Sequence, residues 1–181
     1  MKTAVASKTA KLTSLGALSA LCVFNLMTSE ARSEVVLGVT NTNPIIFGGA
    51  SYIVDFNGSA SGGQTFNFST TQPNTRVVIT FNAECAVDGN SSKYVDIDIV
   101  VDPAGSAGET VVSPSNGDNA LCSGNSTSSD FLYGAGDGWV SAVTQATMVL
   151  PQAGTHTVKV RVNGGAAGVT RLDDMSLTVQ R

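Results

Sequence analysis

The chain has 181 residues and carries 10 Lys and Arg against 14 Asp and Glu, a formal net charge of −4. An acidic balance without a basic cluster argues against a nucleic-acid partner, because phosphate backbones are bound by Lys and Arg. Val, Thr, Ser, Gly and Asn dominate the composition, which favours strands joined by turns over helices.

Residues 1–31 have the parts of a secretory signal peptide. Lys2, Lys8 and Lys11 precede an apolar stretch, and Ser29-Glu30-Ala31 supplies a cleavage site flanked by small residues. The alternative is an uncleaved membrane anchor, but the apolar stretch is shorter than the roughly 20 residues that span a bilayer. We therefore predict export to the medium, the periplasm or the cell surface, with no membrane span after processing.

The rest of the chain, residues 32–181, fits a single domain, since about 150 residues bury a core without help. Apolar and polar residues alternate in segments separated by Gly, Ser, Asn and Pro clusters, as in strands buried on one face. The predicted strands are 34–39, 52–56, 65–69, 76–85, 93–102, 109–112, 139–150, 156–162 and 175–179. No helical crossover separates them, so we predict an all-β, antiparallel two-sheet β-sandwich (jelly roll) of eight or nine strands. Segments 76–85 and 93–102 are expected to pair with each other.

Alternation also predicts which side chains face the core. The expected inward residues are Val95, Ile97, Ile99, Val101, Val158, Val160 and Val162. The opposite face of segment 93–102 carries three carboxylates, those of Asp96, Asp98 and Asp102. They form either a solvated outer face or one wall of a cation site, and oxygen-rich cation sites usually also draw ligands from loops.

Residues 32–181 contain two cysteines, Cys85 and Cys122. In an exported protein an even number of cysteines predicts a disulfide. Metal binding is the alternative, but a single histidine and no third thiol cannot complete a closed zinc site. We therefore predict one disulfide, between Cys85 and Cys122.

Catalytic machinery is hard to assemble from this sequence. His156 is the only histidine, and no Gly-x-Ser-x-Gly elbow occurs. A histidine at a strand end is more often structural than a general base. We therefore expect a protein that is not an enzyme.

Three aromatic residues, Phe131, Tyr133 and Trp139, flank a glycine-rich segment at 134–138. Rings on the rim of a sandwich can stack on sugars, whereas a lone tryptophan in a sandwich often belongs to the core. Both interpretations of Trp139 stay open, and Phe131, Tyr133 and Trp139 are the candidate ligand-binding residues.

The stretch LPQAGTHTVKV from Leu150 to Val160, followed by Gly164-Gly165 and the Leu172-Asp173 step, resembles the C-terminal strand pair of bacterial jelly-roll carbohydrate-binding modules. This resemblance implies a glycan partner and a structural calcium ligated by Asp173. Residues 32–181 also resemble small exported bacterial sandwiches. They are similar to the tumour-necrosis-factor and complement globular-head jelly rolls, whose trimers imply a homo-oligomer.

Together these features predict an exported, non-catalytic binding module that recognises a glycan or another cell-surface component. The alternative is a structural or self-assembling surface protein, trimeric in one form, that has no small ligand. Rim aromatics around a groove favour the first hypothesis, and an uncovered apolar sheet face favours the second.

Overall fold

The computed structural model describes residues 33–48, 52–57, 63–88, 93–113, 120–124, 139–163 and 169–181. The predicted signal peptide lies outside these ranges and stays a prediction. The described residues form eleven strands. Within the described residues, no helix has the length and apolar character needed to cross a bilayer.

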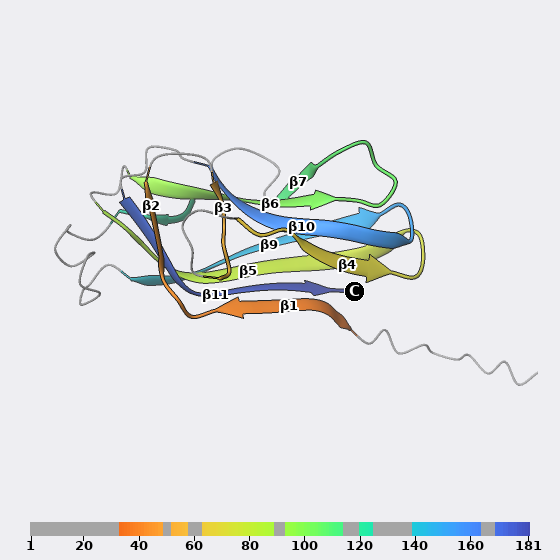
Figure 1. Cartoon of the computed structure of the whole chain (residues 1–181), viewed down its shortest axis with the longest axis horizontal. Helices are drawn as coiled ribbons and strands as arrows, with labels where there is room; N and C mark the ends of the chain where they lie inside the picture. Colours follow the sequence, from red (N-terminus) through yellow and green to blue (C-terminus); the bar gives the residue numbers. More distant parts are fainter. Residues whose placement is uncertain are drawn as a thin grey trace, which may run out of the picture. The chain divides into compact units, whose positions relative to one another are not determined.

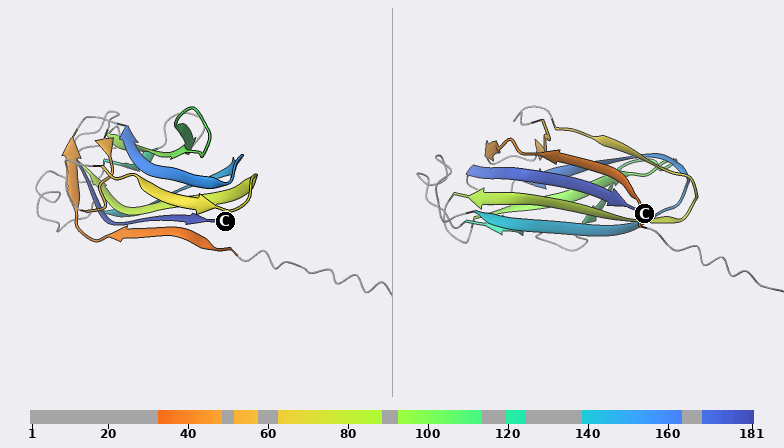
Figure 2. Two further views of the ribbon diagram at one scale, coloured as in Figure 1. Left: turned by 45° about the vertical axis from the view of Figure 1, so that its right-hand side comes forward. Right: turned by 90° about the horizontal axis from the view of Figure 1, so that it is seen from below.

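Two antiparallel sheets form the predicted sandwich (Figure 1). Sheet A contains β1 (Val35–Asn41), β2 (Ile45–Gly48), β5 (Thr75–Val87), β9 (Val140–Leu150) and β11 (Val169–Gln180). Sheet B contains β3 (Tyr52–Ile53), β4 (Phe66–Thr70), β6 (Tyr94–Asp102), β7 (Thr110–Ser113), β8 (Ala120–Ser123) and β10 (Gly154–Asn163). The order in sheet A is β1, β11, β5 and β9, with β2 also pairing with β11. The right-hand view of Figure 2 shows these ribbons side by side, from orange β1 to cyan β9.

Sheet B is arranged around two long central strands, β10 and β6. Strands β3 and β4 both pair with one side of β10, while β7 and β8 both pair with one side of β6. The chain crosses between sheets after β2, β4, β5, β8, β9 and β10. Antiparallel strands that alternate between layers make the all-β sandwich expected from the absence of helical crossovers.

The core lies between the sheets and follows the predicted alternation. Each of the seven residues expected to face inward on β6 and β10 is at most 1% exposed. Sheet A supplies the opposing layer, with Val77, Ile79, Phe81, Ala83, Cys85, Leu172, Met175, Leu177 and Val179. Period-two burial on both sheets is what gives a sandwich its single apolar layer.

Two expectations about the strands were wrong. There are eleven strands where eight or nine were expected, and the additional ones are β2 and β8, which have four residues each. Strands β5 and β6 do not pair with each other: β5 lies between β11 and β9, and β6 lies in the other sheet. The reason is that two alternating strands produce the same pattern whether they lie side by side or face each other across a core.

A β-bulge in β11 keeps its side chains in phase with the core. Asp173 is opposite Glu84 and Ser176 is opposite Asn82, so two residues of β11 lie against one residue of β5. Asp174 within this bulge has φ 43°, in the left-handed region. The additional residue allows both Leu172 and Leu177, at 0% exposure, to face inward.

The disulfide predicted between Cys85 and Cys122 is confirmed, with a Cα–Cα distance of 6.2 Å. Cys85 belongs to β5 in sheet A and Cys122 to β8 in sheet B. The bond therefore joins the two sheets across the core, and both residues are buried.

Candidate functional site

The edges of the two sheets differ in how continuous they are. One edge of sheet A is divided between β1 and β2, and the edges of sheet B are divided between β3 and β4 and between β7 and β8. None of these six strands is longer than seven residues. The fourth edge is the single strand β9, with 11 residues. It is therefore the one long, uninterrupted edge in the described part of the fold.

Strand β9 has none of the features that usually protect a sheet edge. Its sequence, VSAVTQATMVL, contains no charged residue and no proline. It pairs with β5 from Val140 to Leu150 without a register shift. Among the described strands, none pairs with its other side. Charges, prolines and bulges are the devices that keep exposed edges from pairing with other chains, so β9 presents an open row of backbone donors and acceptors.

Most of the exposed apolar side chains lie on two strands, β7 and β9. Six large hydrophobic residues are exposed in the described regions, and four of them lie on β7 and β9. These four are Val111 at 45%, Val140 at 37%, Val143 at 62% and Val149 at 46%. Val143 and Val149 lie opposite Asn82 and Arg76 on the outer face of sheet A, whereas Val111 lies opposite Val100 in sheet B. We call the β9 edge together with Val143 and Val149 the β9 side.

The outer face of sheet A next to β9 is polar but uncharged. Three successive rows of cross-strand neighbours run over it: Thr40, Ser176, Asn82 and Val143; Gly38, Thr178, Thr80 and Gln145; and Gln180, Val78 and Thr147. Gln145 Nε2 donates to Thr80 Oγ1 at 3.1 Å. The charged side chains that directly follow these rows are Arg76 at one end and Glu84 and Asp173 at the other. An uncharged face of this kind can approach a copy of the same net charge without direct contact between like charges.

Trp139 immediately precedes β9 and lies outside the core. Its side chain is half-buried, and the Arg171 guanidinium carbon lies 4.7 Å from its ring centroid. Arg171 also reaches the Asp173 carboxylate, with Nη2 and Oδ2 3.4 Å apart. The structure therefore brings together two of the residues singled out from sequence, Trp139 and Asp173, through an arginine that sequence reasoning missed. Phe131 and Tyr133 lie outside the described residues.

Two carboxylates on the outer face of β6, those of Asp98 and Asp102, accept hydrogen bonds from neighbouring side chains. Asp98 lies opposite Arg161 in β10 and accepts from its Nη2 at 2.8 Å. Asp102 accepts from Ser106 at 3.4 Å. Within the described residues, no group of three or more His, Cys, Asp and Glu side chains is arranged to hold a metal ion. The structural calcium at Asp173 stays a prediction carried by the resemblance alone.

His156 is a structural residue of the core. Its Nδ1 accepts from the Ala104 N–H at 2.8 Å, so the proton lies on Nε2, 2.9 Å from Thr70 Oγ1. Its ring also packs against Phe68, with centroids 5.2 Å apart. Desolvation by burial lowers the pKa of His156 below its usual value. Since both ring nitrogens are used and the residue is 0% exposed, it has no access to a substrate in this arrangement.

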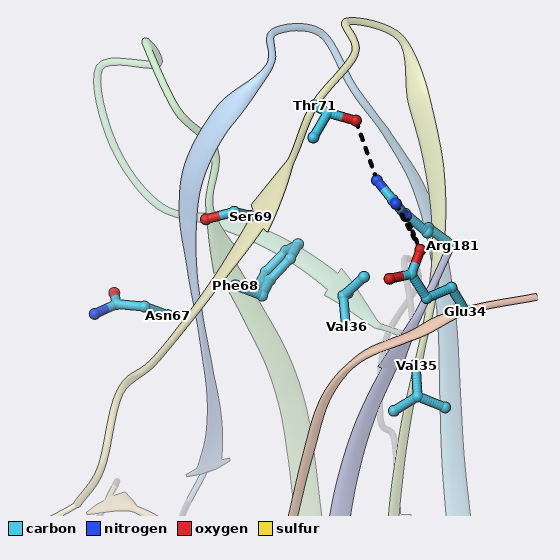
Figure 3. Close-up of a pocket in the computed structure, with 8 residues that line it drawn as sticks. All are labelled: Glu34, Val35, Val36, Asn67, Phe68, Ser69, Thr71 and Arg181. Atoms are coloured by element: carbon cyan, nitrogen blue, oxygen red, sulfur yellow. Dashed lines mark hydrogen bonds and ion pairs between the residues drawn. The ribbon is translucent and has the colours of Figure 1, made fainter.

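An open groove lies between the β1 and β4 edges (Figure 3). The buried ring of Phe68 faces it, and Glu34, Thr71 and Arg181 line one end. The Arg181 guanidinium pairs with Glu34, Nη2 to Oε2 at 2.5 Å, and donates to Thr71 Oγ1 at 3.3 Å. The Glu34 carboxylate and the Arg181 guanidinium neutralise each other, so the side chains that line the groove carry no net charge.

Sequence reasoning did not find the β9 side. The absence of charge from residues 140–150 is visible in the sequence, but a buried central strand and an open edge strand can share that composition. What distinguishes them is the neighbouring strand, and that is a property of the topology.

No family model matches the chain, and no match is found among curated proteins. Similarity to solved structures is limited to the fold. The structure of the infectious bursal disease virus Gx strain is 14% identical with a TM-score of 0.38, covering 83% of this chain and 32% of that one. The VP2 subviral particle of infectious bursal disease virus is 18% identical with a TM-score of 0.39, covering 83% and 33%. This chain thus spans about a third of the length of each.

Proposed function

We propose that this protein is a structural, self-associating β-sandwich without catalytic activity, which works outside the cytoplasm and assembles through the β9 side. The observation that carries the proposal is the 11-residue, uncharged edge β9, which has no pairing strand in the described structure. Open edges add strands from other chains, since their backbone groups are already aligned for pairing.

The charge distribution supports a second copy as the partner. The chain has a net charge of −4, so two copies repel each other at long range unless salt screens them. The uncharged rows of sheet A and the β9 edge add no direct contact between like charges to that repulsion. Exposed valines on the same surface add apolar area, which is removed from water when copies meet.

Sedimentation or light scattering over a wide range of protein concentration tests this function. We expect the average mass of the mature protein to rise above that of a monomer as concentration increases. We also expect added salt to strengthen association, because it screens the overall repulsion and breaks no interfacial ion pair. A monomer at every concentration would rule the function out.

Two matched variants locate the contact. Val143→Lys places a charge on the β9 edge at a residue that is 62% exposed, and Val35→Lys places the same charge on the divided edge at a residue that is 56% exposed. Lysine on an edge opposes strand addition. Val143→Lys should therefore shift the mass toward the monomer, whereas Val35→Lys should leave it unchanged. Equal shifts in mass for the two variants would rule out β9 as the contact.

Glycan recognition is a second candidate, and one observation favours it. Trp139 is half-buried beside Arg171 at the end of the sandwich and not in the core. Tryptophan and arginine side by side offer stacking and hydrogen bonding to a sugar. Retention on immobilised polysaccharides tests this candidate independently of the oligomeric state.

A further inference from the structure

We propose that two copies of this chain join β9 to β9 in antiparallel orientation about a two-fold axis, so that the two sheets A become one continuous sheet. This inference rests on the proposed self-association and specifies its geometry. A two-fold contact uses the same surface on both copies, so it requires a strand whose sequence is complementary to itself when reversed.

The length of β9 selects another β9 as its partner. The other three edges consist of short strands, and β1 is further interrupted by a register shift between Val35 and Leu37. Strands β6 and β7 show a similar shift between Ile99 and Val100. A straight strand of 11 residues cannot pair along its length with a divided or bulged edge, because the backbone groups fall out of register. A second β9 is the one described edge that offers a matching row.

The exposed valines define the register. Val143 and Val149 point to the outer face of sheet A, since they lie opposite Asn82 and Arg76 of β5. If Ala146 lies on the two-fold axis, Val143 of one copy is directly opposite Val149 of the other, and the pair occurs twice. Directly opposed β-branched residues stabilise a strand pair, and they cover each other from water.

The remaining pairs in this register are also compatible. On the outer face Gln145 meets Thr147 of the second copy, two side chains that can share a hydrogen bond. On the inner face Ala142 meets Leu150 and Thr144 meets Met148, each a small residue against a larger one, while Ala146 meets its own copy. No two like charges are opposed, because β9 contains none. The contact also closes on itself, so it predicts a dimer and not a fibre.

Intermolecular disulfide trapping tests the register. In the double variant Val143→Cys/Val149→Cys, oxidation should give a covalent dimer held by two bonds. Within one chain the two thiols are about 20 Å apart along the strand, too far to join. Either single variant should give at least tenfold less covalent dimer, since in this register each thiol faces a valine.

The matched control is Arg76→Cys/Asn82→Cys on β5. These residues lie directly beside Val149 and Val143 on the same face, one strand further in, and they should not trap a dimer above the background of random collisions. If the unmodified protein self-associates but the β9 pair traps no more than this control, the two-fold geometry is wrong and the proposed function stands. If the unmodified protein is a monomer throughout, both are wrong.

Hydrogen exchange of the unmodified protein provides a second measurement that needs no variant. Amides on the open side of β9 should exchange at least tenfold more slowly at associating concentrations than at high dilution, because partner carbonyls now accept their hydrogens. Amides of β1 and β2 should exchange equally under both conditions. Protection that appears on β1 and β2 instead of β9 would overturn the inference even if dimers form.

Discussion

The two edges of sheet A have similar compositions but differ in shape. Strands β1 and β2 read VVLGVTN and IIFG, and β9 reads VSAVTQATMVL, so neither edge carries a charge. Between β1 and β2, however, the chain turns: the Asn41 side chain accepts from the Asn43 N–H at 2.8 Å, and Pro44 follows. Strand β9 continues through all its residues without a break. The two edges therefore differ in their continuity and not in their charge, and continuity is what a second strand needs for pairing along its length.

Glu34 and Arg181 add to the protection of the β1 edge. Glu34 and Arg181 exchange two backbone hydrogen bonds of 2.9 Å, and their side chains form an ion pair just beyond β1. A charged pair at the end of a strand must be desolvated before another strand can extend across it. At the start of β9 the Arg171 guanidinium lies over the ring of Trp139.

The largest effect on stability is expected from removing the disulfide, which lies near the continuous edge. Cys85 lies on β5, opposite Val140, the first residue of β9. The disulfide therefore joins the strand next to the start of β9 to β8 in sheet B. Cys85→Ala/Cys122→Ala frees a loop with a sequence separation of 37, which should cost about 4 kcal/mol in the free energy of unfolding. Chemical denaturation measures the loss. Hydrogen exchange should show β8 and β9 opening before β1 and β2, and the reverse order would contradict the assigned tether.

Acid should lower the stability of the fold through His156, which lies on β10 in sheet B. The pKa of His156 is lowered by burial, so the unfolded chain takes up a proton near pH 6.5 while the folded chain does not. Stability is therefore complete above about pH 6.5 and falls as the pH drops toward the folded pKa, by at most about 1.4 kcal/mol per pH unit. Denaturation at several pH values checks this. His156→Gln cannot titrate and should flatten the slope, and an unchanged slope would assign it to other groups.

A smaller effect is expected at the bulge in β11, the strand that holds the divided edge. Asp174 is exposed and adopts φ 43°, a conformation that costs a β-branched residue about 1–2 kcal/mol. Asp174→Val should therefore lower the free energy of unfolding by that amount, while Asp174→Gly should change it by less than about 0.5 kcal/mol. Thermal unfolding of both variants checks the prediction. Equal stability of the two would mean that the bulge relaxes.

The fold was largely predictable from the sequence, because burial of alternate residues is a local signal. Val95 to Val101 and Val158 to Val162 show it clearly, and the structure buries them as expected. The disulfide was predictable for a different reason, since residues 32–181 contain two cysteines, which allow one pairing. Which strands are neighbours was not predictable, and the expected pairing of β5 with β6 failed because side-chain alternation contains no information on the partner strand.

The candidate site was less accessible to sequence reasoning. Trp139 was left open between core and rim, and only its contact with Arg171, 32 positions further along the chain, places it outside the core. His156 was expected at the start of a strand as a structural residue; β10 begins two residues earlier, at Gly154, and His156 is buried and hydrogen-bonded within it. The open side of β9 depends on the absence of a neighbour among the described strands. Such long-range relations arise from topology and leave no mark in local composition.

An effect as small as that at the bulge is expected for Trp139, at the start of β9. Truncation of a core tryptophan costs about 3–5 kcal/mol. Here the ring is half-buried and its specific contact is with the Arg171 guanidinium, an interaction worth about 0.5–1 kcal/mol at exposed sites. Trp139→Ala should therefore lower the free energy of unfolding by about 1–2 kcal/mol, measured by chemical denaturation. A loss in the core range would return Trp139 to the core.

The same variant separates the two candidate functions at this end of the sandwich. If the protein binds glycans through Trp139, retention of the unmodified protein on immobilised polysaccharides should fall on truncation, while its concentration-dependent mass stays the same. If Trp139 only covers the end of β9, retention should be absent from the start. Arg171→Lys is the control variant for the contact with Trp139: it keeps the positive charge beside the ring but loses the planar guanidinium that stacks on it. Reduced self-association in Trp139→Ala, with Val143→Lys behaving as the unmodified protein, would move the interaction surface from the β9 edge to the sandwich end.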